Sequence, residues 1–182
     1  MRFARRGRLD RLLVHYEQAD VTYPEVAATR GELPAGYRHT RRRTRVGDGR
    51  DVFIRAAAAV LSWEMHRRSG LAVAANGAAA DGNTVLLGYG PSPALVVPCR
   101  VVYEIDEPGR RGFAYGSLPD HPEQGEEAFL VVIDDDRHVW LEVTAFSRPG
   151  LRIVRLAGPL ARGLQDMATR RYERTLREMV TA

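Results

Sequence analysis

The feature that most constrains the fold is a run of β-rich segments between Leu71 and Phe146. The segments read TVLLGYG, ALVVPCRVVYEID, RGFAYGS, EEAFLVVID and HVWLEVTAFS, and every break between them contains Gly, Pro or Asp. β-Branched and aromatic residues bounded by such turn residues are typical of strands. Because consecutive strands joined by short loops pair antiparallel, this pattern predicts a meandering antiparallel sheet.

A long helical pattern follows these strands, over residues 151–180. Its apolar residues fall on one face at helical spacing and are Ile153, Leu156, Leu160, Leu164, Met167, Tyr172, Leu176 and Met179. A sheet cannot cover its own apolar face, so we expect this helix to lie across it. The predicted fold class is α+β: a curved antiparallel β-sheet wrapped around a long C-terminal helix. A cleft between the two would suit a small molecule.

The first half of the chain is predicted to be less regular. A length of 182 residues fits one domain, which we place at residues 21–182, with residues 1–20 as an N-terminal helical extension. A second helix is predicted from Asp51 to Gly70, where glycine supplies the C-terminal stop. Trp63 and His66 lie at i,i+3 near its end. We expect Trp63 in the core and His66 as its half-exposed partner.

The composition narrows the classes of function. The single cysteine, Cys99, cannot form an internal disulfide, and no Cys/His cluster has metal-ligand spacing. No stretch is long and apolar enough to span a membrane, and the first residues lack the apolar region of a signal peptide. We therefore expect a cytoplasmic protein with no metal or other cofactor and no membrane span. The sequence leaves the oligomeric state open.

Arginine supplies all 27 of the Lys+Arg side chains, against 23 acidic residues, for a net charge of +4. The segment YRHTRRRTRVG alternates with period two and predicts a charged strand at a sheet edge. Its residues Arg41, Arg43 and Arg45 could contact nucleic acid. The modest net charge and the absence of interleaved aromatic residues weigh against that partner.

The stretch FAYGSLPDHPEQGEEAF, from Phe113 to Phe129, carries the main candidate site. The connection between its two strand-like runs is predicted to be longer than the about two to five residues of a plain hairpin loop, and long loops are often functional. Pro119 and Pro122 would fix the backbone around His121. Glu127 shares a strand face with Phe129, whereas Glu126 points to the other face. His121 and Glu127 are thus a candidate acid–base pair. Alternatively, His121 only pins the loop.

Further side chains could contact a ligand. Arg100 shares a strand face with Glu104, either on the solvent side or lining a cavity, and Tyr103 shares the opposite face with Val101. Arg148, at the end of the last strand, could reach the loop carboxylates. The candidate ligand contacts are Trp63, Arg100, Tyr103, Tyr115, Ser117, Glu123 and Arg148.

Several motifs together resemble one family over most of the chain, from Val21 to Leu176. They are VTYPEVAATRGELPAGY, WEMHRRSGL, PCRVVYEIDEPGRRGFA, YGSLPDHPEQGEEAF and VWLEVTAFSRP. The chain is similar to the DUF1990 family, also called UPF0548, which typically has threonine in place of Ser117 and glycine in place of Asp120. That family has no known function. It is similar to the Bet v 1-like, START-like or SRPBCC superfamily, whose helix-grip proteins bind lipids, hormones and polyketides or act as metal-free enzymes.

Three functional hypotheses follow. The first is a protein that binds a small apolar or amphipathic metabolite between sheet and helix. The second is a cofactor-independent cyclase, isomerase or hydrolase that uses His121 with a carboxylate. The third is a non-catalytic interaction module, with nucleic acid as the less favoured partner.

Overall fold

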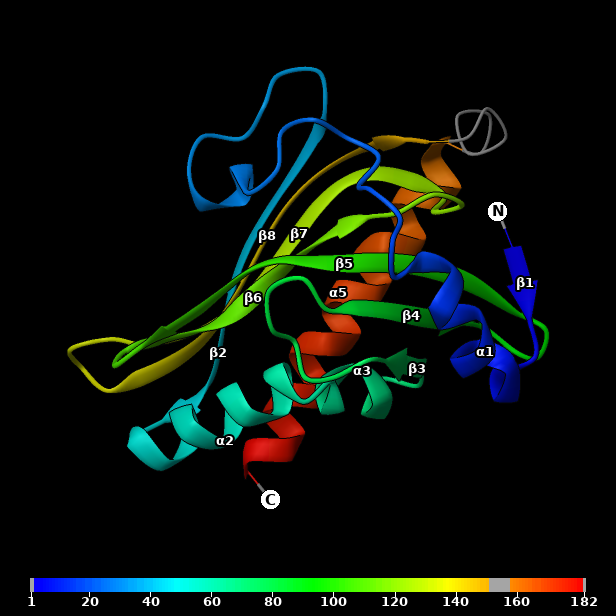
Figure 1. Ribbon diagram of the computed structural model, residues 1–182. Coiled ribbons are helices and arrows are strands. Elements are labelled where there is room, and N and C mark those ends of the chain that lie inside the picture. Colours follow the sequence, from blue (N-terminus) through cyan, green and yellow to red (C-terminus); the bar gives the residue numbers. More distant parts are fainter. Residues whose placement is uncertain (1, 151–157, 182) are drawn as a thin grey trace.

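The computed structural model describes residues 2–150 and 158–181 (Figure 1). Within these residues, eight strands form one antiparallel sheet. Its order is β2 (Arg38–Asp48), β8 (His138–Pro149), β7 (Glu123–Ile133), β6 (Arg110–Ser117), β5 (Ala94–Glu107), β4 (Thr84–Tyr89) and β3 (Ala72–Ala75), and β1 (Arg2–Ala4) pairs with β5. The sheet curves around helix α5 (Gly158–Thr181), which crosses its inner side in Figure 1. The predicted fold class is confirmed, and so is the edge position of the arginine-rich strand β2.

The predicted helix from Asp51 to Gly70 is two helices, α2 (Arg50–Leu61) and α3 (Glu64–Arg68). Between them Trp63 adopts a left-handed conformation with φ 65°, which redirects the chain. The new direction turns His66 into the core, where its exposed fraction is 0%. The prediction of a half-exposed His66 is therefore wrong, because it assumed one continuous helix.

The N-terminal segment packs on the outer, convex face of the sheet. It consists of β1, the 3-10 turns η1 (Arg6–Arg8) and η2 (Val14–Tyr16), and the short helix α1 (Leu9–Leu13). Leu9, Leu13 and Tyr16 are buried there against apolar residues of β4 and β5 and the β6–β7 loop. A later stretch with the 3-10 turn η3 (Ala28–Arg30) covers the same face.

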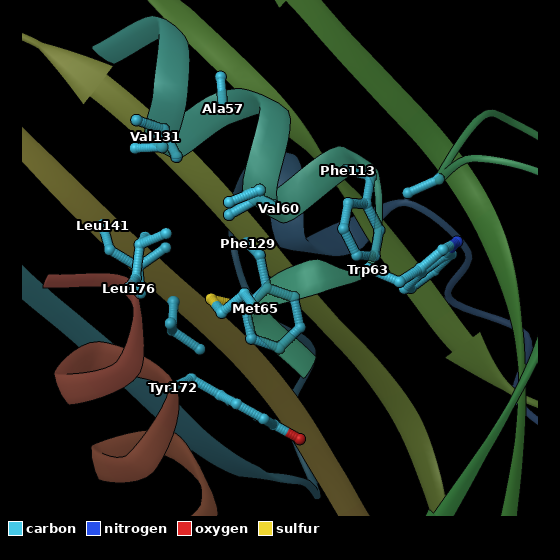
Figure 2. Close-up of a cluster of buried hydrophobic side chains, with 14 of the residues drawn as sticks. Ala57, Val60, Trp63, Met65, Phe113, Phe129, Val131, Leu141, Tyr172 and Leu176 are labelled. Carbon is cyan, nitrogen blue, oxygen red and sulfur yellow. The ribbon is translucent and has the colours of Figure 1, made fainter. Parts of the chain in front are cut away.

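The inner face of the sheet forms the main core with helices α2, α3 and α5. Figure 2 shows the rings of Trp63, Phe113, Phe129 and Tyr172 among aliphatic side chains of the sheet and helices. On α5 the buried side includes Tyr172, Leu176 and Val180. Met167 is 61% exposed, contrary to prediction, because it lies off that side of the helix. The predicted apolar positions Ile153 and Leu156, and the side chains of Leu160 and Leu164, lie outside the described residues.

Two local features differ from the sequence analysis. The long loop is a short one: β6 continues to Ser117 and β7 begins at Glu123, so only residues 118–122 connect them. A bulge in β5 shifts its register between Val101 and Tyr103. One extra residue reverses the side to which later side chains point. Val101 therefore packs in the inner core and Tyr103 in a cluster on the convex face, and they do not share a face.

Candidate functional site

Strand β7 places two adjacent glutamates on opposite faces of the sheet. On the convex face, Glu126 accepts hydrogen bonds from the Tyr23 hydroxyl (2.7 Å), the Ala27 amide (2.7 Å) and the Thr29 amide (3.0 Å). The Thr29 hydroxyl donates a fourth. Glu126 is 3% exposed. Glu126 thus anchors the covering segment to the sheet, and its acceptor sites are occupied.

On the inner face, Glu127 has a single side-chain donor among the residues that the structure describes, the Tyr115 hydroxyl at 3.0 Å. The residue is half-buried, on the same side of the strand as Phe129 and Val131. Burial raises the pKa of the Glu127 carboxyl to about 7, although the bond from Tyr115 acts in the opposite direction. The carboxyl therefore gains and loses a proton near neutral pH. The orientation predicted from the period of the strand is observed.

Further titratable groups surround Glu127 on this face. The hydroxyls of Tyr89 on β4 and Tyr172 on α5 are 2.6 Å apart. Burial, followed by the Glu127 charge, raises the pKa of the Cys99 thiol and of the Tyr115 hydroxyl. The Glu127 charge acts on Tyr89 and Tyr172 in the same direction. We call these residues the inner polar cluster: Tyr89, Cys99, Tyr115, Glu127 and Tyr172.

His66 is buried in the core beside this cluster. Its ring centroid is 5.0 Å from that of Tyr172, 5.2 Å from that of Phe129 and 6.2 Å from that of Tyr115. Neither ring nitrogen has a hydrogen-bond partner among the residues that the structure describes. Burial lowers the pKa of His66 to about 3, so the ring is neutral at neutral pH.

The candidate pair His121 and Glu127 is not joined by a hydrogen bond in the described part of the chain. His121 Nδ1 accepts a hydrogen bond from the Glu123 amide at 2.9 Å, and its own amide donates to the Leu118 carbonyl at 3.2 Å. Burial lowers the pKa of His121 to about 4. These contacts match the alternative in which His121 pins the loop.

Other predicted ligand contacts lie near the ends of β6 and β7. Burial raises the pKa of the Glu123 carboxyl, and the charge of Arg38 opposes that shift. The Ser117 hydroxyl is 2.7 Å from that of Thr22 and accepts the Gly125 amide at 3.0 Å. Arg148 is exposed. It donates to the Gln124 side chain at 3.2 Å and stacks over Tyr37, 4.6 Å from the ring centroid, so it reaches an amide oxygen on β7 rather than a carboxylate of the loop.

Arg100 and Tyr103 serve the convex face. Arg100 donates to the carbonyls of Tyr16 (2.7 Å) and Glu17 (2.8 Å), which ties the N-terminal segment to β5. The Tyr103 hydroxyl is 2.7 Å from that of Thr29. These contacts turn both residues away from the inner polar cluster.

Trp63 is a core residue rather than a wall of an open cleft. Its exposed fraction is 1%, and its ring contacts Phe113 at 4.8 Å between centroids. The indole Nε1 donates to the Gly77 carbonyl at 2.9 Å. Both the ring and its polar atom thus have partners within the protein.

The arginines of β2 that could contact nucleic acid already have partners on the surface. Arg41 donates to the Gly31 carbonyl. Arg43 pairs with Glu142 at 3.1 Å, and Arg45 pairs with Asp48 at 2.6 Å. These contacts reduce the charge that is available to a polyanion.

No group of three or more His, Cys, Asp or Glu side chains in residues 2–150 and 158–181 is placed to hold a metal ion. In the same ranges, no helix is long and apolar enough to cross a membrane.

Solved structures share this fold at low sequence identity. Ara h 8.0201 superposes with a TM-score of 0.57 at 9% identity, over 80% of this chain and 99% of its own. Major latex-like protein 151 from Panax ginseng gives a TM-score of 0.53 at 14% identity, over 78% and 96%. The hypothetical protein jhp0584 from Helicobacter pylori gives 0.58 at 10%, over 86% and 94%. The chain therefore has a Bet v 1-like fold.

The family follows from sequence. The model of DUF1990, a domain of unknown function, matches residues 22–175. A UPF0548 protein from Deinococcus radiodurans is 37% identical over 158 residues, which cover 80% of each chain. A UPF0548 protein from Arabidopsis thaliana is 38% identical over 64 residues, or 31% of each chain. This chain belongs to the DUF1990 (UPF0548) family, as its motifs indicated.

Proposed function

We propose that this protein binds a small amphipathic molecule between the sheet and helix α5, with the inner polar cluster as the polar end of the site. The observation that carries the proposal is Glu127, an inner-face carboxyl with one side-chain hydrogen bond and a pKa of about 7. A half-buried carboxyl with one side-chain donor among the residues that the structure describes gains stability when another group binds its remaining acceptor sites. A ligand would be that group.

The chemistry of the cluster narrows the ligand. It contains a carboxyl, three phenols and a thiol. The charge of Arg38 acts on Glu127, while Arg42 forms a bidentate pair with Glu173 on α5, at 2.6 and 2.7 Å. A site rich in carboxyl and hydroxyl groups suits a hydroxyl, amine or amide better than an acid. The neighbouring aromatic residues Phe129 and Tyr172 would pack against an apolar body.

The remaining candidate residues have secondary roles in this proposal. Ser117 and Glu123 would form the outer end of the site, and His121 would hold the loop beside it. Cys99, a buried free thiol, suits a reducing cytoplasm, where we propose the protein works.

Native mass spectrometry of protein purified gently from its own host tests this proposal. We expect a reproducible added mass on the folded protein that disappears on denaturation and is much reduced in Glu127→Gln. The matched control Glu142→Gln changes a carboxylate on the convex face and should keep the added mass. Bare wild-type protein, or equal loss in both variants, would contradict binding at Glu127.

A second candidate function, catalysis, is favoured by the same carboxyl. A group with a pKa of about 7 can act as a general base or acid at neutral pH, and Tyr115 lies within hydrogen-bond distance of it. Such a pair could serve a cofactor-independent isomerase, cyclase or hydrolase. Once a ligand is identified, its turnover should rise with pH through about 7 if Glu127 is the base. Turnover unchanged in Glu127→Gln would exclude this role.

A further inference from the structure

A hollow lies at the N-terminal elements of the molecule, away from the inner polar cluster. It is lined by residues of β1, η1 and α1 and of the turn that precedes β5. Strand β1 and helix α1 lie at the right of Figure 1. Its volume is about 610 Å³, and its lining is Arg2, Phe3, Ala4, Arg5, Arg8, Arg11, Leu12 and Pro93. Apart from Pro93, these residues precede the part of the chain that the family model matches, residues 22–175.

The charges in this lining are of one sign. It contains four arginines and no carboxylate. Arg2 acts on Tyr16 and Asp120, whose side chains are hydrogen-bonded to each other. The exposed side chains of Arg5, Arg8 and Arg11 form no ion pair or hydrogen bond with any residue that the structure describes. Elsewhere on the surface, arginines such as Arg43 and Arg45 do have acidic partners. Clustered cations without counter-charges attract anions.

The arginines are presented by anchored elements. Strand β1 pairs with β5, with Arg2 opposite Val96 and Ala4 opposite Ala94. Helix α1 is fixed by Leu9 and Leu13, which are 2% and 7% exposed. Between these elements, the amide of Arg8 donates to the carbonyl of Arg5 at 2.8 Å. The guanidinium groups therefore start from fixed backbone positions around one concave surface.

The same hollow has an apolar part. Phe3 is 55% exposed, which is unusual for a large aromatic side chain, and Leu12 and Pro93 lie in the same lining. An exposed ring beside several guanidinium groups can contact the apolar part of a ligand while the arginines hold its charge. The volume also falls within the about 300–1,000 Å³ of small-molecule sites.

We propose that this hollow binds a small phosphorylated molecule with an apolar or aromatic body. Planar guanidinium groups bind phosphate oxygens in pairs, and Arg5, Arg8 and Arg11 are the side chains placed to do so. Phe3, Leu12 and Pro93 contact the remainder of the molecule. The headgroups of an anionic membrane offer the same phosphate chemistry, so the experiment must separate the two sources.

Isothermal titration calorimetry of this 182-residue chain with phenyl phosphate, inorganic phosphate and phenol provides the test. We expect saturable binding of phenyl phosphate, weaker binding of inorganic phosphate, and none of phenol. Affinity should fall as salt is raised, because the contact is electrostatic. In the variant Arg8→Gln/Arg11→Gln, affinity for phenyl phosphate should fall about tenfold or more, since charged hydrogen bonds are lost. Phe3→Ser should lower the affinity for phenyl phosphate but not the affinity for inorganic phosphate.

The matched control is Arg170→Gln/Arg174→Gln, which removes the same charge from the exposed side of α5. It should keep the wild-type affinity. Equal weakening in both double variants would overturn the proposal, because the effect would then come from net charge. Binding of phenyl phosphate that does not saturate would also overturn the proposal. A third outcome is that phenyl phosphate does not bind, while the protein binds phosphatidylglycerol vesicles but not phosphatidylcholine vesicles. The arginines then form a membrane-binding surface, and the proposed site is wrong.

Discussion

Glu126 and Glu127 are neighbours in one strand, yet their surroundings differ completely. Glu126, on the convex face, takes hydrogen bonds from Tyr23, Ala27 and Thr29. Glu127, on the inner face, takes one from the residues that the structure describes, the Tyr115 hydroxyl. The first arrangement holds a covering segment on the sheet. The second leaves acceptor sites without a donor in the described part of the chain. The number of donors, rather than burial alone, separates a structural carboxylate from a candidate functional one.

The same difference extends to the two faces as a whole. On the convex face, polar side chains such as Arg100 and Tyr103 form hydrogen bonds with backbone carbonyls or hydroxyls of the N-terminal segments. On the inner face, His66 has no partner among the described residues. Changes on the two faces should therefore differ in sign as well as in size.

The largest expected effect is at Glu126. Glu126→Ala leaves the donors from Tyr23, Ala27 and Thr29 unsatisfied, and we expect the free energy of unfolding to fall by about 3–5 kcal/mol. Urea denaturation at neutral pH measures it. Glu142→Ala, which removes a more exposed carboxylate, is the control. A loss below about 1 kcal/mol for Glu126→Ala would mean that the bonds to Glu126 are not a structural anchor.

Glu127→Gln should act in the opposite direction. The pKa of this carboxyl is about 7 in the folded protein, against an ordinary value of 4.5, so the folded state binds its proton more tightly. Wild-type stability therefore falls as pH rises from about 4.5 to 7, by at most about 3 kcal/mol. At pH 8 the variant should be the more stable protein, with the gain vanishing toward pH 4.5. Parallel stability curves would show that the carboxyl titrates normally.

His66→Phe should change the response to acid. The pKa of His66 is about 3 in the folded protein, against an ordinary 6.5, so the unfolded chain takes up a proton first as pH falls. Stability from the neutral ring is complete above pH 6.5 and is lost toward pH 3. Between pH 7.5 and pH 5, wild type should lose about 2 kcal/mol more than the variant in denaturation experiments. An identical loss would place His66 in contact with water.

The smallest effect is expected on the surface of β2. Arg43 pairs with Glu142 and lies over the ring of Trp140, 4.3 Å from its centroid. Both contacts are exposed, so Arg43→Ala should change the free energy of unfolding by less than about 1 kcal/mol. Thermal denaturation compares it with Glu126→Ala. A larger loss would mean that the convex surface outside the covering segments also holds the sheet together.

Much of this comparison can be predicted from sequence. The strand from Glu126 to Val131 follows a period of two, which puts Glu127 on the side of Phe129 and Glu126 on the other. The turn residues predicted the antiparallel meander, and the apolar spacing predicted the long helix. The local sequence pattern could not predict which side chains contact one another across the fold. Tyr89 and Tyr172 are 83 positions apart in the sequence, and only the packing of α5 on the sheet brings their hydroxyls together.

Two local departures from regular structure explain the residues that were misplaced. His66 follows a residue with a left-handed backbone, and nothing in a tryptophan side chain signals that conformation. Tyr103 follows a bulge, and its segment reads as one uninterrupted strand. In both cases the pattern was interpreted with a fixed period, and one residue broke the period. A signal for His66 was nevertheless present, since it lies i+3 from a buried tryptophan.

The bulge in β5 also sets how this strand tolerates changes in length. The first part of the strand faces Val101 toward the inner core, and the part after the bulge faces Tyr103 toward Thr29 and Arg30 on the convex side. Deleting Val102 would remove the extra residue and restore plain alternation, with Tyr103 opposite in direction to Val101 and still on the convex side. Regular pairing of all residues, without the bulge, would instead bring Tyr103 to the inner side. At this position the bulge, more than the identity of the residues, decides which layer of the protein each later side chain joins.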